Sequence, residues 1–259
     1  MAPTDSDVNV ELRRKRVSHK QPKLGQRVAQ RILDAICDKG MVAGDMLPSE
    51  PKLMDHYQVG RGTLREALRV LEAHGIITVR PGPGGGPMVS AADGPVDLAN
   101  TMKLHLQLRG ATYEEIADGR LAIEPFLARL AAERQDPAGL QALRGVMAEF
   151  DDVDLDDADA VTALSWRFHR AIGAMSGNRV VDLLGSALIE VHKSGDRREA
   201  PFTSPQRAAT RRRFQQIADA IFAGDAAQAE YYASLAMRYY ARQFLPKHPD
   251  VAKAAIRWH

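Results

Sequence analysis

The chain of 259 residues contains one cysteine, two tryptophans and few aromatic residues in general. A single cysteine, Cys37, excludes an intramolecular disulfide. Long apolar runs are also missing. None reaches the roughly 18 residues that a membrane-spanning helix needs, and no apolar signal segment precedes the charged N-terminus. We therefore expect a cytoplasmic protein with no membrane partner.

Sequence signatures of catalysis are equally scarce. The chain has no nucleophile motif, no phosphate-binding loop and no complete set of metal ligands. The alternative of an enzyme would use His169 and His192, with nearby carboxylates, as acid and base. Because nothing else supports that chemistry, we predict that the chain is not an enzyme and carries no cofactor.

Residues 62–73 have the pattern of an amphipathic helix with a charged flank. Its apolar residues lie three, four and seven positions apart, which places them on one stripe (Leu64, Ala67, Leu68 and Leu71). Arginines four positions apart form a second stripe (Arg61, Arg65 and Arg69). Arginine can reach both acceptors of a guanine edge, so this helix suits the major groove of DNA. The alternative is a solvated face with incidental arginines.

The residues on both sides of this helix predict a complete DNA-binding fold. Before it, Ser49 is placed to cap a short helix over residues 50–57, and residues 58–60 allow only a tight turn. That is helix-turn-helix spacing. After it, residues 76–80 and 88–90 have strand patterns around the breakers at 81–87, which predicts a β-hairpin wing. Apolar periodicity predicts a third helix over residues 24–38.

This stretch resembles the winged helix of the GntR family of bacterial transcription regulators. The likeness covers roughly residues 22–90 and rests on Leu47-Pro48-Ser49-Glu50, Arg61, Arg65-Glu66-Ala67-Leu68, Leu71, Gly75-Ile76-Ile77 and the wing glycines. The resemblance implies that Arg61, Thr63 and Arg65 contact DNA. It also implies that Gly82, at the wing tip, meets the minor groove or the backbone. The expected DNA-binding surface further includes Ser49, Gly60 and Gly62.

Two positions depart from the family pattern. Gly60 replaces the usual Ser or Thr before the recognition helix and can offer only its backbone amide to phosphate. Pro51 stands where the best-known fatty-acid-responsive members have an arginine that contacts a base. Both changes predict an altered operator preference.

Residues 1–20 form a basic arm with few apolar residues, which we expect to be disordered. The arm is either a flexible phosphate contact, which adds salt-dependent affinity, or a solvated tail. Basic residues are also more frequent in the N-terminal part of the chain than in the rest. Residues 1–92 have 14 Lys and Arg against 10 Asp and Glu, whereas residues 93–259 have 21 against 23. The more basic part is the part expected to read DNA.

Small residues and breakers at 91–95 indicate a hinge, which predicts domains over residues 21–92 and 93–245 and a C-terminal tail over 246–259. Helices are expected over residues 98–108, 112–133, 137–150, 160–175, 178–192, 205–222 and 225–244, and the aspartate-rich stretch 151–159 is an expected solvated loop. The predicted fold is mainly α. It combines a winged helix-turn-helix of three helices and a hairpin with an antiparallel bundle of about seven helices.

The bundle resembles the FCD ligand-sensing domain of the FadR branch of the family. The likeness rests on Arg120 with Glu124, Ala131-Ala132, Phe168-His169, Ser176-Gly177-Asn178, Ala220-Ile221 and Gly224-Asp225. Many FCD domains hold a divalent metal, and the matching positions here are Ser165, His169, Phe214 and Ala236. One imidazole and a hydroxyl cannot replace a carboxylate and three imidazoles, so we expect no metal. His169 is then either a polar group in the cavity or a satisfied core histidine.

The resemblance also implies an effector cavity, which Phe214 and Ala236 would make apolar. We expect a fatty acyl-CoA or another apolar acid, because each buried methylene gains about 0.8 kcal/mol. A small carboxylate held through a metal is the alternative. Arg120 would hold the acidic end, unless it forms a helix-surface pair with Glu124. The remaining expected effector residues are Ser165, His169 and Asn178.

Two further groups of residues leave alternatives open. Arg207 and Arg211-Arg212-Arg213 would either meet the phosphates of CoA or form a solvated basic face. Four tyrosines, Tyr231, Tyr232, Tyr239 and Tyr240, favour bundle core or a dimer seam over a stacking site.

Together these features predict a ligand-responsive transcription regulator, with repression as the family's usual mode. A homodimer would place two winged helices on a short palindromic operator, because the two-fold symmetry of the protein is mirrored in the DNA site. An effector in the bundle would change DNA affinity by binding one arrangement of the two DNA-binding domains better than another.

Overall fold

A computed structural model describes residues 23–82, 85–90, 94–193 and 202–258. The expected basic arm over residues 1–20 lies outside these ranges. The chain separates into two compact units, Met1–Ala92 and Asp93–His259. Each unit has its own apolar core. The predicted fold class is confirmed: the molecule is mainly helical, with a two-stranded hairpin in the first unit and a helical bundle in the second.

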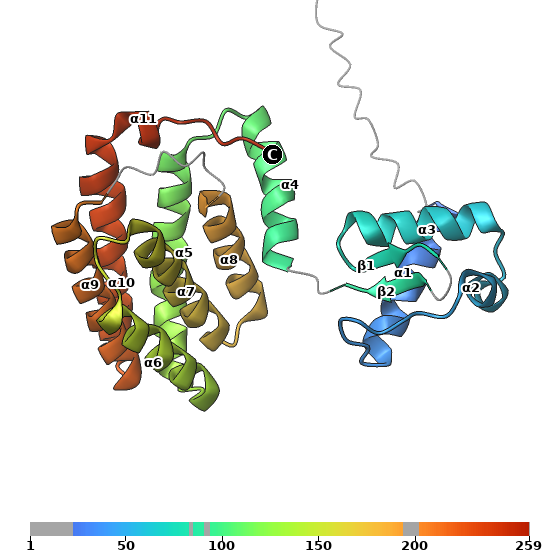
Figure 1. Ribbon diagram of the computed structural model, residues 1–259, viewed down its shortest axis with the longest axis horizontal. Coiled ribbons are helices and arrows are strands. Elements are labelled where there is room, and N and C mark those ends of the chain that lie inside the picture. Colours follow the sequence, from blue (N-terminus) through green and yellow to red (C-terminus); the bar gives the residue numbers. More distant parts are fainter. Residues whose placement is uncertain (1–22, 83–84, 91–93, 194–201, 259) are drawn as a thin grey trace, which may run out of the picture. The chain divides into compact units, whose positions relative to one another are not determined.

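The first unit packs three helices against a hairpin (Figure 1). The helices are α1 (Leu24–Asp38), α2 (Glu50–Tyr57) and α3 (Arg61–Ala73), and the strands are β1 (Ile77–Arg80) and β2 (Gly86–Val89). The strands are antiparallel, with Ile77 opposite Val89 and Arg80 opposite Gly86. The apolar stripes of α1 and α3 meet in a core that includes Val28, Ile32, Leu64, Leu68 and Leu71. Burial of these stripes leaves the arginine stripe of α3 on the surface.

The turn between α2 and α3 is set by backbone conformation. Gln58 ends α2 in the left-handed region, with φ of 53°, and Gly60 is extended just before α3. Ser49 precedes α2 in the N-cap position, but its hydroxyl makes no capping hydrogen bond. The side-chain cap expected of Ser49 is therefore wrong, although Pro51 does lie in the first turn of α2.

The hairpin is joined to the chain segment that precedes α2. The Leu47 amide donates to the Pro87 carbonyl across 2.9 Å, and Met46 forms an isolated bridge with Met88. Gly82 lies beyond the end of β1 with φ of +99°, a conformation that side-chain-bearing residues rarely adopt. The hairpin therefore has a supported base and a glycine-bearing end.

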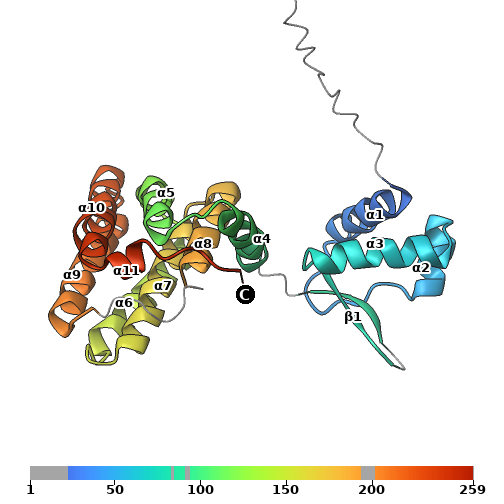
Figure 2. The ribbon, with the colours of Figure 1, turned by 90° about the horizontal axis from the view of Figure 1, so that it is seen from above.

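The second unit is a bundle in which α5 has a central place (Figures 1 and 2). Its main helices are α4 (Gly94–Leu108), α5 (Tyr113–Arg134), α6 (Pro137–Asp152), α7 (Ala158–Met175), α8 (Arg179–Lys193), α9 (Ser204–Phe222) and α10 (Ala226–Tyr239). Helix α5 lies against α7, α8, α9 and α10. A side chain on α5 can therefore meet groups from several other helices.

Aspartate caps explain where three of these helices begin. The carboxylates of Asp136, Asp157 and Asp225 accept hydrogen bonds from backbone amides in the first turns of α6, α7 and α10. Helix α5 begins with a capping box formed by Thr112 and Glu115. Local polar residues thus determine these helix starts before any packing is considered.

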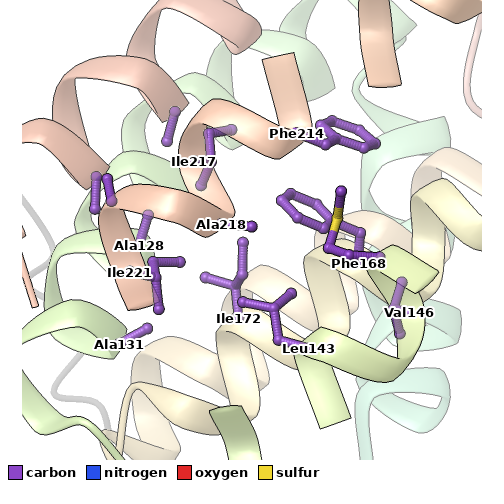
Figure 3. Close-up of a cluster of buried hydrophobic side chains, with 14 of the residues drawn as sticks. Ala128, Ala131, Leu143, Val146, Phe168, Ile172, Phe214, Ile217, Ala218 and Ile221 are labelled. Atoms are coloured by element: carbon purple, nitrogen blue, oxygen red, sulfur yellow. The ribbon is translucent and has the colours of Figure 1, made fainter. Parts of the chain in front are cut away.

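The largest apolar core lies among α5, α6, α7, α9 and α10. Figure 3 shows its centre, where Phe168 and Ile172 of α7 meet Phe214 and Ile217 of α9. The rings of Phe168 and Phe214 are stacked, with centroids 4.2 Å apart. The core thus places two aromatic rings directly beside His169.

The C-terminal segment differs from the expected tail. Instead of one helix to residue 244, the chain passes from α10 into a π-helix (Tyr240–Phe244), a 3-10 turn (Leu245–Lys247) and α11 (Pro249–Ala252). Ile256 is only 1% exposed, and its amide donates to the Ala111 carbonyl across 2.9 Å. The residues from 246 to 258 are therefore packed on the bundle, because they cover apolar surface at the start of α5.

Candidate nucleic-acid interface and effector site

Helix α3, the recognition helix expected from the sequence, presents its arginines on one exposed face. Arg61, Arg65 and Arg69 are exposed and Thr63 is partly buried, whereas the apolar stripe of the same helix is buried. This arrangement follows from a helical repeat near 3.6 residues, which separates the two stripes around the axis. The guanidinium groups are therefore on the surface of the first unit.

Glu50, the first residue of α2, lies beside the central arginine of this face. Its Oε2 atom is 3.7 Å from Nε of Arg65, whose side chain is 61% exposed. An exposed pair at this distance contributes little stability. It biases the direction of the Arg65 side chain and leaves the guanidinium exposed.

The backbone at the start of α3 is open to solvent. Gly60 and Gly62 are exposed, and a Cβ added at either position would meet no other atom within 4 Å. The first amides of a helix have no partner within the helix and attract phosphate. Glycine therefore leaves room for a phosphate to approach these amides closely. Gly82, at the end of the hairpin, is similarly open.

A buried cluster of charged side chains lies inside the bundle. Nε of Arg120 is 2.5 Å from Oε1 of Glu124, one turn later on α5. Nδ1 of His169, on α7, is 2.7 Å from Oε2 of the same carboxylate. Both carboxylate oxygens therefore have a cationic or polar partner. Arg120 and Glu124 are buried, so the alternative of a pair on the helix surface is wrong.

The electrostatics of the cluster favour an ionised Glu124. Burial by itself would raise the pKa of this carboxyl, but Arg120 and then His169 outweigh burial and lower the pKa to about 2. The cluster thus holds a buried carboxylate and a buried guanidinium in contact. The cost of burying each charge is offset by the other and by their hydrogen bonds.

His169 is held on two sides. Its Nδ1 atom contacts Glu124, and its ring meets Phe214 edge-on, with centroids 5.2 Å apart. Two roles were expected for His169. The Nδ1 contact with Glu124 is that of a core histidine whose nitrogen has a partner. The same residue also lines a cavity, together with Glu124, Phe168, Ala236 and Met237.

This cavity is small. Its volume is about 10 Å³, which is the space of roughly one water molecule. A drug-sized ligand needs a pocket on the order of several hundred Å³. The apolar lining expected from Phe168 and Ala236 is present, but the cavity in this structure has no room for an acyl chain.

Comparisons with known proteins agree with both units. Residues 24–85 match the family described as "Bacterial regulatory proteins, gntR family", and residues 115–239 match the FCD domain. Over 209 residues the chain is 30% identical to the uncharacterized HTH-type transcriptional regulator YcbG of Bacillus subtilis (strain 168), which covers 81% of this chain and 84% of that protein. The chain belongs to the GntR family. It is a transcription regulator with an FCD domain, and not an enzyme.

Two further proteins are similar to this GntR regulator. The HTH-type transcriptional repressor NanR of Citrobacter rodentium (strain ICC168) is 30% identical over 171 residues, 65% of this chain and 64% of that protein. The solved structure of Streptococcus agalactiae GntR superposes with a TM-score of 0.66 at 25% identity, covering 85% of this chain and 100% of that one. Among the described residues, moreover, no helix is both long and apolar enough to cross a membrane.

The four positions that resemble the metal ligands of other FCD domains do not fit a metal here. The Ser165 hydroxyl donates to the Val161 carbonyl across 2.9 Å, and Nδ1 of His169 is engaged by Glu124. Phe214 and Ala236 offer only carbon. Within the described ranges, no group of three or more His, Cys, Asp or Glu side chains is placed to hold a metal ion. The donor set therefore lacks the ligands that a tetrahedral site needs.

Asn178 lies apart from the buried cluster. It is exposed before α8, where its side-chain oxygen accepts from the amides of Val180 and Val181. This position makes Asn178 a helix cap and gives no support to its expected contact with an effector.

The arginines of α9 face the aspartate-rich loop. Arg211 pairs with Asp151, and Arg207 donates to the carbonyls of Leu155 and Phe202 and lies near Asp156. Arg213 instead packs over the ring of Tyr239, 3.7 Å from its centroid. Arg207 and Arg211 are therefore paired within the protein. The side chains of Asp151 and Asp156 are 55% and 80% exposed, so the stretch 151–159 is solvated as expected, although residues 151–152 belong to α6 and residues 158–159 to α7. The pairing of Arg207 and Arg211 gives no support to a contact with CoA phosphates.

The residues beside Arg120 include a group that the sequence did not single out as a binding site. The guanidinium of Arg120 lies over the Trp166 ring, 5.2 Å from its centroid, and the His192 ring lies 5.2 Å from the same indole. The sequence suggests for His192 only the alternative of an acid or base, and for Tyr240 the bundle core or a dimer seam. Their meeting depends on α8 and the π-helix, which are 48 residues apart at the contact, so no local pattern could have revealed it.

Proposed function

We propose that this GntR regulator is a cytoplasmic repressor that binds a short palindromic operator as a homodimer and leaves it when an effector binds the bundle. The observation that carries the DNA-binding part is the exposed arginine face of α3 above a buried apolar stripe. Repression is supported by the similarity to a protein named as a transcriptional repressor. Arg61, Thr63 and Arg65 contact bases, while Ser49, Gly60, Gly62 and Gly82 lie along the phosphate backbone.

The proposed effector is a small organic acid bound at Arg120 without a metal. Two observations support it, the buried guanidinium and the donor set that does not fit a metal, and the cavity beside Glu124 has no room for an extended chain. A charged group so deeply buried is suited to an anionic ligand. The same observations favour a small acid over the fatty acyl-CoA expected from the sequence and over a metal-held carboxylate.

The DNA-binding part is tested by selecting bound sequences from a random duplex pool with the full-length protein. We expect a palindromic consensus, bound at least 1,000-fold more tightly than random DNA, on the order typical of specific regulators. Arg65→Ala removes that preference because it removes the bidentate reader of a guanine. Arg27→Ala, an exposed arginine on α1, is the matched control and retains the preference. If Arg65→Ala retained the selected consensus and its preference, α3 would not be the reading helix.

The proposed dimer is supported by the exposed leucines Leu104 and Leu108 on α4. We expect sedimentation equilibrium to give about twice the 28.4 kDa mass of one chain. Replacing both leucines with Ser is expected to weaken association. A monomer at concentrations that still bind the operator would contradict the paired arrangement.

A further inference from the structure

A carboxylate near the end of α3 is hydrogen-bonded to the hairpin wing formed by β1 and β2. The backbone amide of Val79, in β1, donates to Oε1 of Glu72, in the last turn of α3, across 3.2 Å. Helix α3 and strand β1 lie side by side in the first unit (Figures 1 and 2). The contact therefore links the helix that carries the exposed arginines to the first strand of the wing.

The turn that ends α3 makes this contact possible. The Ile76 amide donates to the Leu71 carbonyl across 2.9 Å, and the Gly75 amide donates to the Glu72 carbonyl across 3.0 Å. Gly75 has φ of 67°, the left-handed conformation in which many helices end. Because this turn reverses the chain, β1 returns beside the last turn of α3. Glu72 and Val79 thus meet although they are seven residues apart.

The outer part of the wing is held at one level from two sides. Ile77 is 1% exposed and anchors the start of β1, whereas the other residues of the strand are exposed. Val79 is opposite Pro87 of β2, and the Pro87 carbonyl accepts from the Leu47 amide across 2.9 Å. The contact on the β2 side is thus made by backbone atoms alone. On the β1 side, the side chain of Glu72 supplies it.

The stability of α3 alone does not account for Glu72. A carboxylate in the last turn of a helix lies at the negative end of the helix dipole, which is unfavourable. It also lies on the helix expected to approach DNA, whose phosphates repel a negative charge. Among the described residues, the bond to Val79 is the only hydrogen bond that the Glu72 side chain makes. This bond is the benefit that offsets both unfavourable effects.

We infer that Glu72 is a positioning residue for DNA binding, which holds the wing so that the end of the wing and the arginine face of α3 contact one operator together. Arg80 follows Val79 directly and is exposed, and Gly82 lies two residues further on. Fixing Val79 therefore restricts where both can lie. A wing that is ordered before binding loses less entropy on binding. The inference rests on the proposed operator binding and adds the residue that orients the wing.

The test measures equilibrium binding of the full-length protein to the selected consensus duplex and to a random duplex of the same length. Glu72→Ala is expected to lower the ratio of the two affinities about 10-fold, as the loss of one well-placed DNA contact does. Glu72→Gln keeps an oxygen that accepts from Val79 and is expected to retain the ratio. Asp55→Ala removes another exposed carboxylate from the same unit. It is the matched charge control and should also retain the ratio.

Hydrogen exchange reports the contact itself. We expect the Val79 amide to exchange about 5-fold faster in Glu72→Ala than in the wild type, as the loss of one hydrogen bond allows. Glu72→Gln should exchange at nearly the wild-type rate. Equal exchange in the wild type and in Glu72→Ala would show that the contact does not hold the wing. Glu72 is exposed and alanine favours helix, so this variant is expected to fold.

A double-mutant cycle distinguishes positioning from a merely structural effect. Arg80→Ala removes the exposed cation of β1 and is expected to weaken operator binding. In that variant, Glu72→Ala should cause less than about 2-fold further loss, because residues that act together are not additive. Additive losses would show that Glu72 acts by another route than the wing. Full operator affinity in Arg80→Ala would mean that this part of the wing does not contact the DNA, which also overturns the inference.

The possible failures are distinguishable. If no consensus is selected, the proposed operator binding fails and the role of Glu72 fails with it. If a consensus is bound but Glu72→Ala keeps the wild-type ratio, only the role of Glu72 is overturned. If Glu72→Gln loses as much as Glu72→Ala, the charge rather than the hydrogen bond matters, and the positioning role is again overturned.

Discussion

Nδ1 of His169 lies 2.7 Å from Oε2 of Glu124, and this contact joins α7 to α5 through a buried charge. Arg120 engages the other oxygen of the same carboxylate. The three side chains are buried or nearly buried inside the bundle. In this protein, therefore, the side chains of Arg120, Glu124 and His169 form the polar centre of the bundle.

Replacing Glu124 tests how strongly this centre depends on its carboxylate. Glu124→Gln removes the negative charge and leaves the guanidinium of Arg120 buried without compensation. We expect a loss of about 3–5 kcal/mol in unfolding free energy, measured by urea denaturation. The matched control is Glu133→Gln, because Glu133 pairs with Arg129 at the same i,i+4 spacing on α5 but is exposed. That variant is expected to lose less than about 1 kcal/mol, and equal losses would contradict the distinction.

His192 is expected to make the unfolding free energy depend on pH below about pH 6.5. Its folded-state pKa is lowered, so the unfolded chain takes up a proton below pH 6.5 while the folded protein does not. Stability is then fully present above pH 6.5 and falls by about 1 kcal/mol per pH unit below it. His192→Gln should flatten the curve between pH 6.5 and 5. A wild-type curve already flat in that range would show that His192 is protonated in the folded state.

Glu124 is expected to make the unfolding free energy depend on pH in a more acidic range, below pH 4.5. Its pKa falls from 4.5 to about 2 on folding, because Arg120 and His169 outweigh the opposing effect of burial. The stabilisation is present above pH 4.5 and is lost as the pH falls toward 2. Thermal unfolding of Glu124→Gln in this range should vary less with pH than that of the wild type. Parallel curves for the two proteins would contradict this assignment.

The C-terminal segment provides a test of packing. Ile256 is buried with Ala99, Tyr113 and Val191, so Ile256→Ala is expected to cost about 2–4 kcal/mol of bundle stability. Trp258, two residues further on, is 55% exposed, and Trp258→Ala should change stability by less than about 1 kcal/mol. Chemical denaturation of both variants makes the comparison. Indistinguishable stabilities would mean that the segment behaves as a tail.

Metal binding should be recoverable by substitution. Phe214 is 5.2 Å from His169 between ring centroids, and Ala236 lines the same cavity. We expect the triple variant Ser165→Asp, Phe214→His, Ala236→His to hold about one Zn²⁺ per chain by elemental analysis. Phe214→His alone, which adds one imidazole, should hold little. Stoichiometric zinc in the wild-type protein would show that its own side chains suffice.

Much of the fold was predictable because its determinants are local. The cap Asp136 and the capping box at Thr112 act within one helical turn, and the helices expected from residues 137 and 112 begin there to within one residue. Helix α7 begins at Ala158, two residues before its expected start. The stripes of α3 follow from helical periodicity, and they predicted correctly which of its residues are buried. The family motifs then identified the regulator class.

The buried site depended on contacts that no local pattern encodes. Arg120–Glu124 and Arg129–Glu133 have the same spacing on one helix, yet only the first pair is buried, because α7 and α8 cover that part of α5. In the same way, Arg211 meets Asp151 across 60 residues, and His192 meets Tyr240 across 48.

By itself, then, the sequence determined the helices, the winged DNA-binding unit and the membership of the GntR family, since capping, periodicity and motif spacing act over a few residues. Only the tertiary structure decided that Arg120, Glu124 and His169 form a buried polar cluster, that the last residues cover the bundle, and that Nδ1 of His192 lacks a partner among the described residues. Those outcomes depend on which helix faces pack together, and side-chain burial and pairing arise only from that packing.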